Sequence, residues 1–377
     1  MVPARSALPA HVRLLLESLV EPQRCRDLDD RRWDLLIRAA RSARLLGVLA
    51  TRIASTGPID AIDEPVRRQL TAALVEPRFQ RVKALYLIAT VEKLMRPLGV
   101  TPILLKGAAY IVQKLPLSEG RLLSDVDLMV PRSELDRVER QLTHAGWTFR
   151  KTDAYDQHYY RAWSHELPPM TCAGQALDLD LHHAILPPTG RLHPDAARLI
   201  GSAVAVADCP FRVLAPADQV LHAAAHLFQD SDCIGRLRDL VDFDGLMRCF
   251  ASRDPRFGER LLEHARAHQL GRPLYYAVQL SRAWLDTPVA AALERDLKDH
   301  LEPNRVARRV VIWSAASVLP PPDPDAGYSA RERIAAALMR LRAMWLRMPP
   351  WLLAYHSMRK AVRQFSIRRG SRHPRTA

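Results

Sequence analysis

Two aspartates separated by a single residue are the first feature of this chain that could carry chemistry. Asp125 and Asp127 alternate with Val126, Leu128 and Val130, a period of two that predicts a half-buried strand. Alternate side chains of a strand share a face, so both carboxylates project together while the aliphatic groups pack behind them. Neighbouring carboxylates repel each other, and a bound cation relieves the repulsion. Mg²⁺ suits such a pair, because it binds through one or two carboxylates together with substrate phosphates.

A strand–turn–helix segment precedes this pair. Pro102 to Leu105 is a short apolar run that predicts a strand, and Lys106-Gly107 turns the chain into a helical stretch that begins at Ala108. Backbone N–H groups at the start of a helix attract an anion, glycine permits close approach, and lysine adds a positive charge. The segment therefore predicts a phosphate site. The alternative interpretation of Lys106 is an ordinary surface lysine.

A second alternating block follows about fifty residues later. Asp178, Asp180 and His182 fall on one face of a predicted strand, with leucines on the other face, and His183 is directed to the opposite side from His182. A third block begins a helix near Pro216 and carries His222 and His226 at the i, i+4 spacing used by zinc proteases. Ala223 replaces the glutamate that such a protease needs, so we expect a packed, hydrogen-bonded histidine pair there and not a zinc site. The alternative for His226 is that it faces the predicted phosphate site.

These segments resemble the nucleotidyltransferase fold of the DNA polymerase beta superfamily. They are most similar to a bacterial subgroup of uncharacterised nucleotidyltransferases, in which a Lys-Gly turn replaces the usual Gly-Ser turn. The subgroup has an Arg-x-x-Ser-Asp-x-Asp signature, matched here by Arg121, Ser124, Asp125 and Asp127, and a strand that ends in Asp-x-His. The resemblance extends to about Leu285.

The resemblance implies a role for each matching residue. The catalytic residues and Mg²⁺ ligands would be Asp125, Asp127 and Asp180, with Asp180 also the candidate general base. The nucleotide-binding residues would be Lys106, Gly107, Arg121, Ser124 and His182. For Arg121, a pairing with Asp125 and a contact with the triphosphate remain equal alternatives.

The reaction implied by the resemblance is transfer of a nucleoside monophosphate from an NTP to an unidentified acceptor, with release of pyrophosphate. The acceptor could be a protein, a small molecule or an RNA. One alternative is a non-catalytic nucleotide-binding or scaffold protein, and another is a nucleotidyltransferase directed at RNA.

The net charge of +14 is concentrated near one end of the chain. Residues 328–377 hold twelve basic residues and one acidic residue, Glu332, and so account for +11 of it. A nucleic-acid enzyme is expected to carry basic charge around its active site as well. We therefore expect the basic tail to be dispensable for the chemistry. Its aromatic and basic stretch is expected to form a helix that packs its Trp and Leu face onto the domain, with a solvated basic face. The alternative is an anionic partner for the tail, a membrane surface or RNA.

The pattern along the chain predicts an α+β protein: a small mixed sheet, the nucleotidyltransferase core, flanked by helical regions. The predicted parts are a helical region at 1–98, the core at 99–215, a second helical region at 216–319, and a Pro-rich break followed by a basic helical tail at 320–377. Within the core, strands are expected at 147–150, 159–165 and 176–182, and a short strand pair at 203–207 and 211–214.

Localisation is predicted from absent signals. The chain has no run of eighteen apolar residues, so no transmembrane segment is predicted. The first ten residues lack the pattern of a secretory signal. The five cysteines are scattered, odd in number and free of C-x-x-C pairs, which favours a reducing compartment. We therefore expect a cytoplasmic protein.

Overall fold

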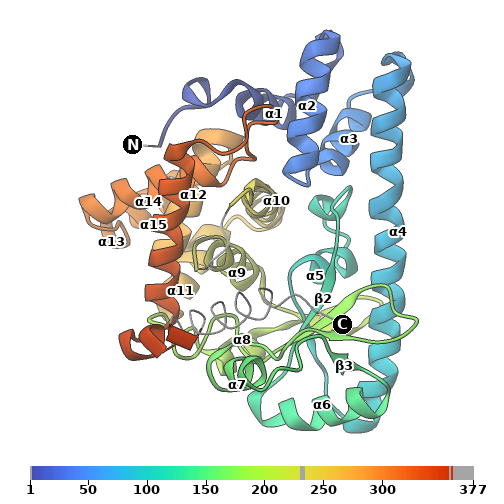
Figure 1. The fold of residues 1–377 in the computed structure, drawn as a ribbon, viewed down its shortest axis with the longest axis vertical. Coiled ribbons are helices and arrows are strands. Elements are labelled where there is room, and N and C mark those ends of the chain that lie inside the picture. The colour runs from blue at the N-terminus through green and yellow to red at the C-terminus, as the bar shows by residue number, and fades with distance from the viewer. Residues whose placement is uncertain (1, 230–233, 356–357, 360–377) are drawn as a thin grey trace, which may run out of the picture.

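A seven-stranded mixed sheet lies between two helical regions (Figure 1). The computed structural model describes residues 2–229, 234–355 and 358–359. The predicted α+β class is confirmed. Short 3₁₀ helices link the larger elements at Arg5–Ala7, Pro22–Asp27, Ile59–Ala61, Arg96–Leu98, Pro116–Ser118 and Arg132–Glu134.

The N-terminal region is helical, as predicted. It consists of α1 (Ala10–Val20), α2 (Asp30–Ser42), α3 (Leu46–Ser55) and α4 (Glu64–Met95). Asp29 caps α2 by accepting a hydrogen bond from the backbone N–H of Arg32, a common way to satisfy the first turn of a helix. The long helix α4 runs along one side of the molecule, from α2 and α3 to the edge of the sheet near α6 (Figure 1).

The sheet has the strand order β3-β4-β5-β2-β1-β7-β6. Its strands are β1 (Ile103–Leu104), β2 (Asp125–Met129), β3 (Thr148–Phe149), β4 (Met170–Thr171), β5 (Asp178–His182), β6 (Val204–Val206) and β7 (Cys209–Val213). The predicted strand pair near residues 203–214 is therefore present, and it joins the same sheet beside β1.

The two acid-bearing strands are neighbours. β2 and β5 pair in parallel, with Asp125 opposite Asp178 and Asp127 opposite Asp180. Because residues opposite each other in a sheet share a face, this register places Asp127 and Asp180 on the same side. β2 was expected to be half-buried, yet Asp127 and Met129 are as buried as Val126 and the strand is covered on both faces.

Four helices belong to the sheet region: α5 (Lys106–Val112), α6 (Leu135–His144), α7 (Ala154–Trp163) and α8 (Ala196–Ser202). The predicted strand at 159–165 is wrong, because most of that segment is α7. Asp153 caps this helix, and its aromatic residues recur at the helical spacing of four, which brings Tyr155 and Tyr159 against Trp163. The strand preference of aromatic residues misled the prediction.

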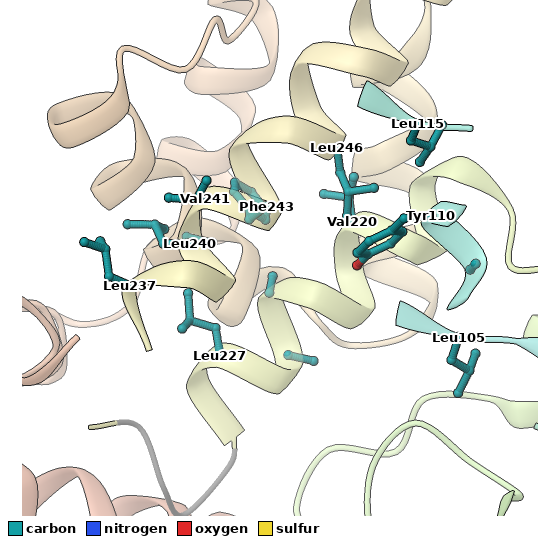
Figure 2. Close-up of a cluster of buried hydrophobic side chains, with 14 of the residues drawn as sticks. Leu105, Tyr110, Leu115, Val220, Leu227, Leu237, Leu240, Val241, Phe243 and Leu246 are labelled. Atoms are coloured by element: carbon teal, nitrogen blue, oxygen red, sulfur yellow. The ribbon is translucent and has the colours of Figure 1, made fainter. Parts of the chain in front are cut away.

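The C-terminal region is a helical array. Its helices are α9 (Pro216–Gln229), α10 (Leu237–Arg253), α11 (Phe257–Ala267), α12 (Gly271–Leu285), α13 (Ala291–His300), α14 (Arg305–Val318) and α15 (Ala330–Arg347). α9 packs against α10, α11, α12 and α15. Figure 2 shows how one buried cluster joins the two regions: Leu105 and Tyr110 come from the sheet side, Val220 from α9 and Leu246 from α10. The sheet and the array therefore share a core.

The Pro-rich break is packed against the N-terminal helices. His11 makes a contact with the Pro321 carbonyl oxygen at 3.2 Å, and Arg38 pairs with Asp325 at 2.7 Å. Beyond it, Ser329 and Glu332 form a capping box that begins α15. The basic residues from position 360 onward lie outside the described residues. No helix in the described part of the chain has the length and apolar composition needed to cross a membrane.

Candidate active site

A cleft of about 310 Å³ opens between the sheet and the helical array. Seven of the eight residues predicted for the site line it: Lys106, Gly107, Arg121, Ser124, Asp125, Asp127 and Asp180. The eighth, His182, is fully buried and lies behind Asp127. The structure thus gathers in one place residues that are separated by more than seventy positions in sequence.

Asp127 is held by two donors. Its Oδ1 atom accepts hydrogen bonds from Lys106 Nζ at 2.6 Å and from His182 Nε2 at 2.9 Å. Burial opposes ionisation of this carboxyl, but the charges and hydrogen bonds of Lys106 and His182 outweigh it and hold the pKa of Asp127 well below its ordinary value. Asp127 is therefore a carboxylate at neutral pH. The same hydrogen bond to Asp127, with the charge of Glu166, raises the pKa of His182 against the effect of burial.

The environment of Asp180 has the opposite effect and favours the protonated form of its carboxyl group. Its Oδ1 atom is buried and has no hydrogen-bond partner among the described residues. Burial, and then the negative charge of Asp127, raise the pKa of Asp180 to about 7. Burial and Asp127 also raise the pKa of Asp125, even though the Ser124 hydroxyl makes a hydrogen bond to that carboxylate. Three of the four carboxyl groups on these two strands line the cleft, and their pKa values are shifted in different directions or to different extents.

Lys106 and Gly107 form the turn into α5. Lys106 has a φ of 45°, a left-handed conformation that is uncommon for a residue with a side chain. This conformation accompanies the pairing of its Nζ with Asp127, where the sequence suggested a phosphate contact. Gly107 is needed for space, because a Cβ atom there would collide with Nη1 of Arg121.

Of the two roles predicted for Arg121, the pairing with Asp125 is wrong, because the guanidinium pairs with Asp242. The contact with a triphosphate stays a prediction. The Nε atom of Arg121 donates to Asp242 Oδ2 on α10 at 2.9 Å, and both side chains are about nine-tenths buried. The guanidinium also lies over the ring of Tyr110, with 5.6 Å between Cζ and the ring centroid. The buried pair joins the sheet to the helical array directly beneath Gly107. The guanidinium remains part of the cleft lining.

Glu166 and His165 belong to the site and were not predicted. They lie on an irregular segment between α7 and β4, where Glu166 forms an isolated bridge with His182. The carboxylate of Glu166 is 3.4 Å from His182 Nε2, and the His165 and His182 rings are 5.4 Å apart. Burial and the positive charge of His182 lower the pKa of His165 well below its ordinary value. The strand predicted at 159–165 had His165 as its last residue, and that wrong strand hid the segment.

The helical array supplies the opposite wall of the cleft. His222 and His226 of α9 both line it, and burial lowers the pKa of each, that of His222 to about 3. α10 and the residue before it contribute Arg236 and Arg238. Burial, and then the nearby charge of Arg121, lower the pKa of Arg238. The same wall carries Asp239 and Asp242, which pair with Arg236 and Arg121.

One further cation comes from the end of the described chain. Arg347, the last residue of α15, also lines the cleft. Its carbonyl oxygen accepts a hydrogen bond from the Thr189 hydroxyl at 3.0 Å, and the backbone N–H of Arg191 donates to the Leu346 carbonyl at 2.8 Å. The basic tail was expected to be dispensable for the chemistry, yet its first helix contributes Arg347 to the lining of the cleft.

The carboxyl groups fit a divalent cation. Asp125, Asp127 and Asp180 lie on adjacent strands in register, and the buried Oδ1 of Asp180 has no hydrogen-bond partner in the described part of the protein. Hard oxygen donors of this kind are those that Mg²⁺ prefers. A cation would offset the mutual repulsion that raises the pKa values of Asp125 and Asp180.

Comparison with known families agrees with this geometry. Residues 29–286, which include every residue predicted for the site, match a family described as uncharacterised nucleotidyltransferase. The comparisons found no match to a curated protein and none to a solved structure. Because the match covers more than half of the chain, the protein belongs to this family of uncharacterised nucleotidyltransferases.

Proposed function

We propose that the protein is a Mg²⁺-dependent nucleotidyltransferase that moves a nucleoside monophosphate from an NTP to an acceptor and releases pyrophosphate. The observation that carries this proposal is the parallel register of β2 and β5, which puts Asp127 opposite Asp180 at the floor of a cleft walled by cationic side chains. The family match supports the same class of reaction.

The charges of the cleft are distributed as this reaction requires. Three carboxyl groups of the lining come from the sheet, and basic side chains line the cleft around them at Lys106, Arg121, Arg236, Arg238 and Arg347. Arg121 and Arg236 pair with Asp242 and Asp239 of the same lining. A triphosphate lying between the two walls would place negative charge beside Arg238, whose pKa is lowered by burial and then by the charge of Arg121. We infer that Arg238 and Arg347 join Lys106, Gly107 and Ser124 in binding the nucleotide.

The roles of the carboxyl groups follow from their environments. In the proposed reaction an acceptor oxygen or nitrogen attacks the α-phosphorus, and the bond between that phosphorus and the pyrophosphate oxygen breaks. Asp180 lines the cleft opposite Asp127, and its Oδ1 has no hydrogen-bond partner among the described residues, so it is the candidate to take the acceptor's proton. Asp127 stays ionised and is fixed in orientation by His182 and Lys106. Mg²⁺ held by Asp125, Asp127 and Asp180 would neutralise charge on the phosphates and align the displacement.

The cellular setting is proposed from the cysteines. Cys25, Cys172, Cys209 and Cys249 are free thiols, and Cys233 lies outside the described residues. Free thiols of this kind suit a reducing compartment, so we propose a cytoplasmic enzyme.

A screen of nucleotides and acceptors tests the proposed function. Purified protein would be incubated with Mg²⁺, each NTP in turn, and cell extract separated into protein, RNA and small-molecule fractions. We expect pyrophosphate release and transfer of the nucleotide label to one fraction. Transfer to RNA would favour the RNA-directed alternative, whereas NTP binding without turnover in any fraction would favour a non-catalytic nucleotide-binding protein.

A further inference from the structure

A second group of metal-ligating side chains lies outside the cleft. Asp218 at the start of α9 and His264 and His268 at the end of α11 bring one ligand atom each to within 4.8 Å of one another. None of the three lines the cleft. Asp218 and His268 are fully buried, and the His264 side chain is 17% exposed. Three helices meet here, because Ser202 at the end of α8 also contacts Asp218.

Asp218 is a buried carboxylate whose ion-pair partners are histidines. In the described part of the chain it pairs with His264 and His268 and with no lysine or arginine. A buried carboxylate needs a compensating charge, since its transfer from water is otherwise costly. That charge can come from a protonated imidazole or from a metal cation. A metal ion bound by all three side chains would supply it.

His268 is only weakly satisfied. Its ring is fully buried, and Nδ1 makes no hydrogen bond to any described residue. Nε2 interacts with Asp218 Oδ1 at 3.4 Å, but the contact lacks the geometry of a good hydrogen bond. Buried polar atoms are nearly always well hydrogen-bonded, so an imidazole that faces a carboxylate in this way calls for an explanation. Coordination of a metal by Nε2 would supply one.

Two of the three spacings between donor atoms can be compared with those of a tetrahedral site. Ligands at about 2.0 Å from a zinc ion are about 3.3 Å apart. The pair Asp218 Oδ1 and His268 Nε2 is already 3.4 Å apart, whereas Asp218 Oδ1 and His264 Nδ1 are 2.7 Å apart. The second pair must therefore separate by about 0.6 Å, a small change for the partly exposed His264 side chain. Ser202 Oγ donates to the other oxygen of Asp218 at 3.0 Å and so orients the carboxylate, as outer partners of a metal site do.

We propose that Asp218, His264 and His268 form a zinc-binding site that ties the start of α9 to the end of α11. Two imidazoles and one carboxylate suit Zn²⁺, whereas the three carboxyl groups of the cleft suit Mg²⁺. The three side chains leave a fourth position on the ion for water. α9 carries His222 and His226 to the cleft, so the ion would hold one end of a helix whose other turns line the active site.

Zinc binding to the full-length protein tests this proposal directly. Protein stripped of metal by a chelator would be titrated calorimetrically with ZnCl₂, and in parallel with Co²⁺, whose visible absorption reports tetrahedral coordination by these donors. We expect one high-affinity equivalent in the wild type. Asp218→Asn, His264→Asn and His268→Asn should each weaken binding at least tenfold, and Ser202→Ala should weaken it less, since it keeps all three ligands.

Two controls separate this site from other histidines. His300→Asn alters an exposed residue of α13 and should leave zinc affinity unchanged. His165→Asn alters the other histidine cluster of the described chain, formed with Glu166 and His182, and should also leave it unchanged. Zinc should raise the melting temperature of the wild type and of both controls by several degrees, which gives a second readout if a ligand variant is unstable. Zinc affinity that survives all three ligand substitutions, or that is lost in His165→Asn instead, would overturn the proposal.

Discussion

Asp127 and Asp180 lie opposite each other in neighbouring strands, yet their carboxyl groups hold protons very differently. Lys106 and His182 both donate to Asp127, so it stays ionised, whereas the buried Oδ1 of Asp180 has no hydrogen-bond partner among the described residues. Pairs of acids whose pKa values are pushed apart are typical of sites that divide acid and base roles. The difference between the two pKa values arises from neighbours that are distant in sequence. The Asp-x-Asp pattern could therefore locate the acids but could not predict this difference.

The ranking of the two acids on β5 is a direct prediction. Asp180→Ala should abolish Mg²⁺-dependent NTP binding or turnover, because Asp180 faces the cleft beside Asp127. Asp178→Ala is the matched control: it lies on the same strand but pairs with Arg150 at 3.1 Å, away from the cleft lining. Both variants would be assayed for nucleotide binding with and without Mg²⁺. A larger loss in Asp178→Ala would show that the wrong acid was assigned.

Lys106 should matter far more than its helix neighbour Lys114. Lys106→Met removes a positive charge bonded to Asp127, and we expect the turnover rate to fall by roughly a hundredfold, as when a preorganised charge is removed from an active site. Lys114→Met, at an exposed position just after α5, should change turnover little. Equal rates in the two variants, with both proteins folded, would exclude a catalytic contribution from Lys106.

At the scale of elements, local periodicity predicted β2, β5 and the fold class. It could not give the parallel register of β2 with β5, because that pairing joins segments about fifty residues apart. It also failed at α7, where aromatic residues with strand preference recur at helical spacing. Since Glu166 and His165 follow α7 on irregular backbone, that failure hid them. The pairing of Arg121 with Asp242 was likewise invisible, because it depends on how α10 packs.

The cleft face of α9 should make the protein sensitive to acid. His222 is buried, and burial together with the charges of Lys106 and His182 lowers its pKa to about 3. Its ordinary pKa is about 6.5, so between these values the unfolded chain binds a proton that the folded protein does not. The contribution of His222 to the free energy of unfolding is therefore fully present above about pH 6.5. Below that pH it falls by about 1.4 kcal/mol per pH unit.

Thermal melts across this pH range test the effect. His222→Asn removes the titrating group, so the melting temperature of this variant should fall less steeply than that of the wild type between about pH 6.5 and pH 5. Over that range the variant should lose roughly 2 kcal/mol less of its free energy of unfolding. His300→Asn, at an exposed position, should keep the slope of the wild type. Identical slopes in all three proteins would mean that His222 titrates normally in the folded state.

At the scale of the whole molecule, the helical array completes the site that the sheet begins. α15 packs against α9 and α14, buries Ala335 and Met339, and ends at the cleft with Arg347. Composition predicted a basic tail beyond a Pro-rich break, and its charge suggested that it was not needed for the chemistry of the active site. Which face a helix buries depends on its partners, so composition could not reveal that Arg347 returns to the active site. Trp345 and Trp351 of the same segment are half or more exposed.

A truncated protein tests whether α15 contributes to the stability of the protein and to NTP binding. Protein ending at Leu319 lacks α15, so we expect a lower melting temperature and weaker NTP binding. Arg347→Ala in the full chain should weaken NTP binding by roughly tenfold to a hundredfold, the range for losing a hydrogen bond to a charged group. Arg333→Ala, an exposed arginine on α15, is the control and should bind as the wild type does. Unchanged binding in both the truncated protein and Arg347→Ala would place the tail outside the site.

Transfer of an α-phosphate label is the most direct measurement of the proposed chemistry. Wild-type protein, Asp125→Asn and Asp127→Asn would each be incubated with α-labelled NTP, Mg²⁺ and the acceptor fraction, after circular dichroism and thermal melts have shown that all three fold. We predict Mg²⁺-dependent transfer by the wild type and none above background by either variant, since each loses one carboxylate charge of the paired strand. Wild-type rates of transfer in either variant would contradict a mechanism based on Asp125 and Asp127.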